Sequence, residues 1–183
     1  FADEEWVGPI ANTGVSHSLA DGEYAKRRSQ CEEALSILGK PSYREVAASD
    51  VQNAPPLLDA VLLKRARHVV GENVRTRMTV DALEKGDWDR VGTCLYASHD
   101  SLARDYEVSC PELDCLVAAA RELGVEGGVI GARMTGGGFG GCTITLLRKG
   151  HLERIREHLA TRYQERFGVV PTFYTARPSQ GTR

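Results

Sequence analysis

A dense cluster of glycines is the feature of this sequence that points most directly to chemistry. Of the 19 glycines in the 183 residues, nine fall between Gly124 and Gly141, and the densest stretch is Gly136-Gly-Gly-Phe-Gly-Gly141. Backbone N–H groups in such a run can approach a ligand or another loop without obstruction by Cβ atoms. Glycine-rich loops commonly hold phosphate in this way. Because a simple hairpin needs only one or two glycines, the run predicts a functional loop rather than a mobile hairpin or a packed bulge.

The residues that follow this loop exclude two familiar phosphate-binding motifs. A P-loop requires Lys and then Ser or Thr after its last glycine, whereas Cys142 and Thr143 follow here. A Rossmann turn leads from a strand into a helix, whereas residues 142–147 have the pattern of a strand. The loop therefore belongs to another class of site.

The other reactive residue types form no recognisable site. The five cysteines show no C-x-x-C pair and no zinc spacing, so we predict no metal site. Their odd number and the lack of a signal-peptide pattern predict a reduced protein of the cytoplasm. The residues His151, His158, Asp87 and Asp89 could act as acids or bases by type, but nothing places them near a substrate.

The composition narrows the class of protein. With 42% hydrophobic and 26% charged residues, the chain has the balance of one globular domain. A formal net charge of −2 argues against nucleic acid as a partner, because phosphate binding needs a basic surface. No apolar run approaches the ~20 residues that cross a bilayer, so we expect no membrane partner.

Hydrophobic periodicity and turn signals predict the elements that position the loop. Helices are expected over 21–38, 57–83, 87–102, 111–123 and 151–167, and strands over 128–134, 142–147 and 169–177. The stretch from Ser109 to Glu112 resembles a capping box with Pro111 in the first turn. Together the elements predict an α+β fold, a two-layer sandwich of an antiparallel sheet with helices, of ferredoxin-like type.

Residues 1–19 show no clear period. Gly8, Pro9 and Gly14 interrupt them, and the pattern allows at most a short strand over 10–15. We therefore expect residues 1–19 to be a lead-in, the end of a further N-terminal domain, and residues 20–183 to be one domain. The acidic start without an initiator Met fits a processed or truncated product.

The residues around the glycine loop carry a family resemblance. The third signature motif of the GHMP small-molecule kinases, in the form that galactokinases carry, resembles Gly131-Ala-Arg-Met-Thr-Gly-Gly-Gly-Phe-Gly-Gly-Cys-Thr143. Three further stretches are similar to family blocks and occur in family order: 15–28, Arg65-Ala-Arg-His-Val-Val-Gly-Glu72 and 98–114. Together the four blocks cover almost all of the chain from Val15 to Tyr174.

This resemblance implies the C-terminal domain of a GHMP kinase. Galactokinases transfer the γ-phosphoryl group of ATP to the anomeric hydroxyl of α-D-galactose, with Mg²⁺. The family's catalytic Asp and Arg, and its serine-rich nucleotide loop, belong to the N-terminal half, and we find no counterpart here. We therefore expect no catalytic residue in this chain, no activity of the chain alone, and the missing N-terminal domain as a partner beside galactose and ATP.

The resemblance also assigns roles to residues of this half. Tyr24 falls where the family has a tyrosine whose hydroxyl touches galactose, the alternative being core packing through the helix period. Support of the nucleotide loop is implied for Thr135, Gly136, Gly137, Gly138, Phe139, Gly140 and Gly141. We interpret Arg133 as part of a structural ion pair at a strand end, and Arg27 and Arg28 as organising their helix.

Two other functions fit the same sequence. One is a non-catalytic, galactokinase-like sensor that binds sugar or nucleotide. The other is a kinase for a different hexose, such as N-acetylgalactosamine or galacturonate. A domain without its partner would also expose an apolar face, through which it could self-associate.

Overall fold

The computed structural model describes residues 5–16 and 20–176 of the chain. The sheet consists of β1 (Trp6–Ser16), β2 (Val129–Thr135), β3 (Gly140–Arg148) and β4 (Thr172–Ala176). The helices are α1 (Ala20–Ile37), α2 (Ala48–Gln52), α3 (Ala60–Lys85), α4 (Trp88–Arg104), α5 (Pro111–Leu123) and α6 (Leu152–Phe167), with a 3₁₀ turn at Lys149–His151.

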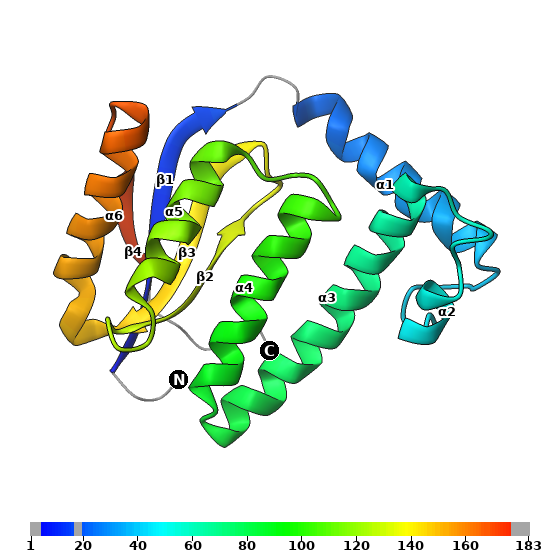
Figure 1. Cartoon of the computed structure of the whole chain (residues 1–183), viewed down its shortest axis with the longest axis horizontal. Coiled ribbons are helices and arrows are strands. Elements are labelled where there is room, and N and C mark those ends of the chain that lie inside the picture. The colour runs from blue at the N-terminus through cyan, green and yellow to red at the C-terminus, as the bar shows by residue number, and fades with distance from the viewer. Residues whose placement is uncertain (1–4, 17–19, 177–183) are drawn as a thin grey trace.

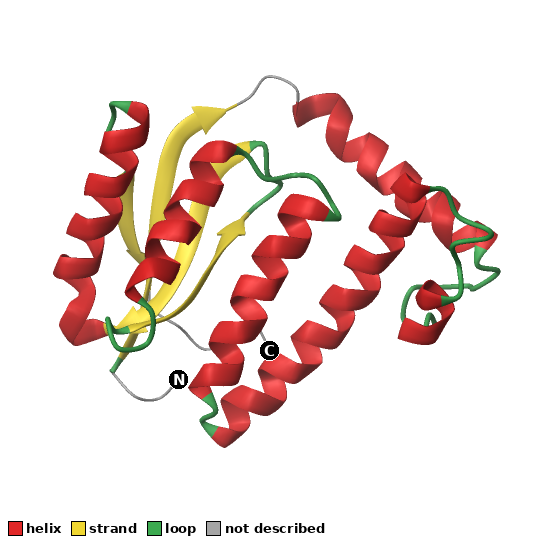
Figure 2. Ribbon diagram, in the orientation of Figure 1, coloured by secondary structure: helices red, strands yellow, loops and turns green. Residues whose placement is uncertain are grey.

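The strands form one antiparallel sheet in the order β2-β3-β1-β4. The chain enters through β1, passes through five helices, forms the β2–β3 hairpin, and returns through α6 to β4. This is the ferredoxin-like arrangement with extra helices in its first crossover, and it confirms the predicted α+β class. Figure 2 shows the strands beside α5 and α6, with the long helices α1 and α3 on the other side of the molecule.

Strand β1 is the largest difference from the sequence expectation. Residues 6–16 pair with β3 on one side, and residues 8–12 pair with β4 on the other, so this stretch belongs to the sheet rather than to a lead-in. The local pattern hides this because Pro9 lacks an N–H group and Gly8 has low strand propensity. Pairing along both edges, together with burial of Val7 and Ala11 in the core, stabilises the strand instead. Residues 1–4 and 17–19 of the expected lead-in lie outside the described residues.

Helices α5 and α6 cover one face of the sheet (Figure 1). The main core lies between them and the strands, and includes Leu116, Leu147, Ile155, Leu159 and Tyr163. Helix α4 runs against β2, and this approach depends on Gly92, because a Cβ there would lie 2.0 Å from the backbone oxygen of Ile130. Helix α3 packs against α4, so α3 is attached to the sheet through α4.

A second core joins α1, α2 and α3 away from the sheet. Its buried members are Ala34, Val46, Val51, Ala54, Leu58, Leu62, Ala66 and Val70. Helix α3 begins where the Asp59 carboxylate accepts the Leu62 N–H at 2.8 Å and ends at Gly86. The five-residue helix α2 was not predicted, because it is too short to show a period.

Helix α5 begins at Pro111 as expected, but the predicted capping box is wrong. The N-cap residue is Cys110, and its side chain makes no capping hydrogen bond. Ser109 instead donates from its hydroxyl to the Asp114 carboxylate at 2.5 Å. The proline at the first turn reduces the number of N–H groups that need a cap.

None of the helices in the described ranges combines the length and the apolar character needed to cross a bilayer. All five cysteine thiols are free.

Candidate functional site

The glycine loop lies at one end of the β2–β3 hairpin, beside an open hollow of about 610 Å³. The loop and the end of β1 line it together, through Asn12, Gly14, Val15, Thr135, Gly136, Gly137, Gly138, Phe139, Gly140, Gly141 and Cys142. All seven residues predicted to support the nucleotide loop are therefore brought together at this one surface.

Close packing against the segment 105–108 fixes the shape of the loop. The N–H group of Phe139 donates to the Val108 carbonyl at 2.7 Å. Gly138 has φ +91°, and a Cβ there would lie 2.3 Å from the same carbonyl oxygen. Gly137, by contrast, has nothing within 4 Å of its Cβ position. The loop thus presses its Gly138 side against its own chain and presents its Gly137 side outward.

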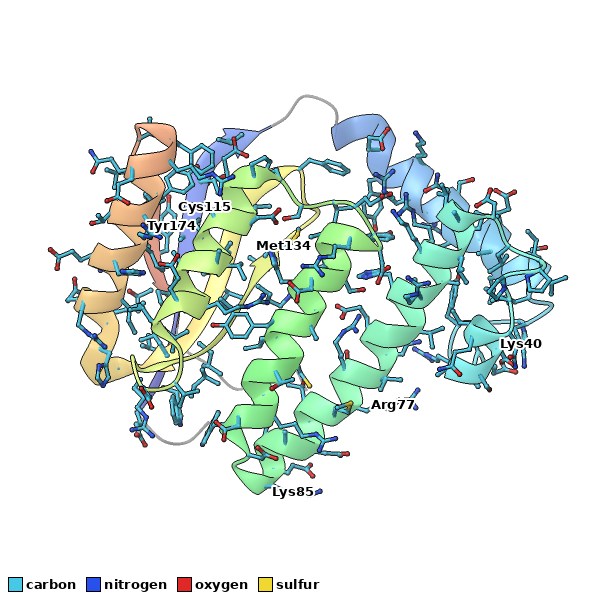
Figure 3. All side chains as sticks on the ribbon, in the orientation of Figure 1. Lys40, Arg77, Lys85, Cys115, Met134 and Tyr174 are labelled. Atoms are coloured by element: carbon cyan, nitrogen blue, oxygen red, sulfur yellow. The ribbon has the colours of Figure 1, made fainter. Side chains whose placement is uncertain are left out.

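A buried histidine holds the strand that leads into the loop. Met134, labelled in Figure 3, lies on the edge strand β2, and its N–H donates to Nδ1 of His99 at 3.2 Å. The proton of the His99 ring is therefore on Nε2, which lies 3.2 Å from Oδ1 of Asp114. Burial by itself raises the pKa of Asp114, but the hydrogen bonds from His99 and Ser109 outweigh it and hold that pKa below its usual value. The histidine satisfies an N–H group that the sheet edge would leave unpaired.

Side chains from β1 and α6 hold the other end of the loop. The Thr13 hydroxyl donates to the Gly141 carbonyl at 2.8 Å. The Tyr163 hydroxyl donates in turn to the backbone oxygen of Thr13 at 3.0 Å. Burial raises the pKa of Tyr163 to about 12, so this phenol remains a donor at neutral pH. The hollow is thus anchored to the main core.

Tyr24 lies on α1 and is 61% exposed. That exposure contradicts the alternative that it packs in a core of the described residues. Its contact with a sugar stays a prediction.

The three arginines considered from sequence have distinct surroundings. Arg28 forms an exposed pair with Glu32 at 2.8 Å on its own helix, as expected. Arg27 is buried and donates to carbonyl groups of the segment 105–108. Arg133 donates from Nε to the Met134 carbonyl at 3.0 Å, and the predicted ion pair is not found among the described residues.

The segment 105–108 is the part of the site that sequence reasoning missed. It receives hydrogen bonds from α1, from α3 and from the glycine loop. The sequence contains one indication of its importance, because the segment lies inside the block 98–114 that resembles the family. That resemblance does not indicate which groups the segment contacts.

Comparison with known families matches residues 79–165 to the description "GHMP kinases C terminal". The chain contains a GHMP kinase C-terminal domain. Among curated relatives, galactokinases of Bos taurus and Homo sapiens are 46% and 48% identical over all 183 residues, which is 45% of each relative. The galactokinase of Thermotoga neapolitana is 44% identical over 174 residues, 95% of this chain and 48% of the relative. The chain therefore spans about half the length of the relatives that it matches.

Solved structures agree with this GHMP domain. The galactokinase of Lactococcus lactis complexed with galactose has a TM-score of 0.88 and 36% identity, and covers 95% of this chain and 45% of that one. The mevalonate kinase of L. major in complex with R-mevalonate has a TM-score of 0.63 at 22% identity over 98% of this chain and 44% of that one, and shows the fold alone.

The described residues of the GHMP domain do not fit a magnesium site. They contain no group of three His, Cys, Asp or Glu that could hold a metal ion. The residues that line the hollow include no carboxylate, the ligand that Mg²⁺ prefers. Small residues and backbone amides fit phosphate better, so we assign no Mg²⁺ ligand to this chain.

Proposed function

We propose that this chain is the C-terminal part of a galactokinase, which transfers the γ-phosphoryl group of ATP to the anomeric hydroxyl of α-D-galactose and gives galactose 1-phosphate. The observation that carries the proposal is the 46–48% identity to galactokinases along the whole chain. The TM-score of 0.88 to a galactokinase complexed with galactose supports it.

In this proposal the two described surfaces serve the two substrates. The outward side of the glycine loop contacts the phosphates of ATP or the loop that binds them, since Gly137 leaves its Cβ position open. Tyr24 directs its exposed hydroxyl toward the sugar. Phosphoryl transfer depends mostly on positioning and on stabilising charge, so both surfaces act by alignment.

The chemistry itself falls to the remainder of the complete enzyme. Mg²⁺, when bound, would neutralise charge on the phosphates. The base or cation beside the attacking hydroxyl is likewise assigned to no residue of this chain. We therefore expect the 183-residue chain alone to show no turnover.

A coupled ADP-release assay tests the proposal. The complete enzyme should turn over ATP with galactose, and the 183-residue chain should not. Turnover by the chain alone would overturn the proposed division of labour. Turnover of the complete enzyme with N-acetylgalactosamine or galacturonate but not with galactose would make it a kinase for another hexose. Calorimetric binding of galactose without any turnover would make it a sensor.

Gly137→Val in the complete enzyme tests the role of the loop. The added Cβ would meet nothing within 4 Å, so stability should be kept while kcat/KM for ATP falls about 10-fold, the effect of losing roughly one phosphate contact. Unchanged ATP kinetics would leave the loop with a structural role only.

We also propose a cytoplasmic location, which the five free thiols support. Self-association of the 183-residue chain is proposed through exposed apolar side chains such as Val169, Val170 and Tyr174, which are 53–57% exposed. A monomer at high concentration in sedimentation would contradict the second proposal.

A further inference from the structure

Arg27 occupies an unusual position for a charged side chain of α1, because only 7% of it is exposed. Its Nε donates to the Tyr106 carbonyl at 2.7 Å, and its Nη2 donates to the Glu107 carbonyl at 3.0 Å. Nη1 donates to the Glu23 carboxylate at 2.7 Å, within the helix. One guanidinium thus binds two successive carbonyl groups of the segment 105–108.

The same segment is bound to the glycine loop. The Val108 carbonyl accepts the Phe139 N–H at 2.7 Å. The ring of Phe139 also faces the guanidinium of Arg27, with 5.8 Å between Cζ and the ring centroid. Arg27 therefore contacts the loop both directly and through the next carbonyl along the chain.

Contacts from α3 hold the segment from the other side. Glu107 has φ +58°, a conformation that costs energy for a residue with a side chain. Its carboxylate accepts from Lys64 at 2.7 Å and from Arg65 at 2.8 Å. Because the segment is fixed on both sides, a shift of α1 cannot be absorbed there without breaking these bonds.

Tyr24 lies three residues before Arg27 on α1, so the two side chains share one side of the helix. A displacement of Arg27 therefore displaces Tyr24 relative to the glycine loop. We infer that Arg27 is a positioning residue that couples the Tyr24 side of the site to the glycine loop. The catalytic meaning of this coupling rests on the proposed function, whereas the physical coupling does not.

Two comparisons on α1 make the inference testable. Lysine keeps the charge of arginine but has its donors on a single atom, so Arg27→Lys does not reproduce the separate contacts that Nε and Nη2 make with the two carbonyl groups. Arg28→Lys is the matched control, because Arg28 is exposed and pairs only with Glu32 among the described residues.

Hydrogen exchange on the complete protein without ligands measures the coupling. Arg27→Lys should speed exchange about 10-fold in peptides 105–108 and 135–141, since the Phe139 amide loses a fixed acceptor. Exchange over 111–123 should not change, and Arg28→Lys should change none of these peptides. If Arg27→Lys fails to fold, Glu23→Gln, which removes the negative charge facing Nη1 of Arg27 and Lys26 but leaves the carbonyl contacts of Arg27 in place, should give a smaller change of the same sign. Equal exchange in the Arg27 and Arg28 variants would overturn the coupling.

Steady-state kinetics of the complete enzyme test whether this coupling affects substrate binding. Arg27→Lys should raise KM about fivefold for galactose and for ATP, with a smaller change in kcat. In the double variant Arg27→Lys/Tyr24→Phe, the fold-increase in KM for galactose should be smaller than the product of the fold-increases in the two single variants, because both substitutions act through one contact. A lower kcat with both KM values unchanged, or full multiplicativity, would overturn the positioning role. No activity in the unsubstituted enzyme would overturn the proposed function and leave the exchange result to decide the coupling.

Discussion

The glycine loop and the Tyr24 side of α1 both depend on the segment 105–108, but different forces hold them. The loop is fixed by backbone geometry: Gly138 lies where no side chain fits, and the Phe139 amide bonds to Val108. The Tyr24 side is fixed by charged groups, above all the guanidinium of Arg27 and the carboxylate of Glu107. Steric fit and hydrogen bonds between uncharged groups set the first surface, whereas ion pairs and hydrogen bonds from charged side chains set the second.

Because different forces hold them, the two surfaces should respond differently to substitutions, pH and salt. Steric fit does not depend on pH or salt, whereas contacts between charged or titratable groups do. We therefore expect substitutions to destabilise the glycine loop most, and acid to weaken the contacts of the Tyr24 side of α1 first.

The largest effect should come from Gly138→Ala. The new Cβ would lie 2.3 Å from the Val108 oxygen at a φ of +91°, so strain and overlap together should lower the free energy of unfolding by about 4 kcal/mol. Urea denaturation measures it. Gly137→Ala is the control and should lose no stability, because its Cβ meets nothing within 4 Å. Equal losses in both variants would mean that packing against Val108 does not define the loop.

Acid should act on the Tyr24 side of α1 through His68, because His68 stacks on Tyr106 of the segment 105–108. Burial lowers the pKa of His68 to about 4, opposed by Glu72 and Asp105 and assisted by Arg75 and Arg133. The unfolded chain binds a proton near pH 6.5 and the folded chain does not, so stability should fall between pH 6.5 and 4, by up to about 3 kcal/mol.

His68→Phe separates this proton from other acid effects. Phenylalanine can keep the stacking on Tyr106, whose ring centroid lies 4.4 Å from that of His68, but cannot titrate. Urea midpoints measured between pH 7 and 5 should therefore vary less in the variant. An equal slope in both proteins would rule out His68 as the source.

His99→Leu should have an intermediate effect on the loop side. The variant leaves the buried Met134 N–H without its acceptor, which should cost about 2 kcal/mol of unfolding free energy. Asp100→Asn is a neighbouring control, because Asp100 pairs with Arg121 at an exposed position and should contribute less than about 1 kcal/mol. Similar losses in chemical denaturation would show that the His99 bridge adds nothing to the edge of β2.

The smallest change in stability should come from Tyr24→Phe. With 61% of Tyr24 exposed, loss of its hydroxyl should change the unfolding free energy by less than about 0.5 kcal/mol. In the complete enzyme the same variant should raise KM for galactose about 3- to 10-fold, the worth of one neutral hydrogen bond. A loss of stability without a change in KM would remove Tyr24 from the site.

Sequence reasoning reached the elements whose signals are local. Pro111 and Gly124 bound α5 at the expected residues, and the glycine run joins two strands that were predicted on either side of it. The fold class followed from the order of these elements.

What sequence reasoning missed depends on partners far along the chain. β1 is a strand because β3 and β4 pair with it, not because of its own residues. The roles of Arg27 and His99 follow from carbonyl and amide groups that lie 79 and 35 residues away. A helical period records which side of a helix is apolar, but not which distant group a polar side chain will reach.

The place of β1 in the sheet has a consequence for folding kinetics. Asn12 pairs with Cys142, so about 130 residues must be closed into a loop before this ladder can form. The contacts among α1, α2 and α3 span far shorter separations. The helical part should therefore collapse early, while β1 waits with both edges unpaired until the last strands are available, which makes closure of the sheet the slow step.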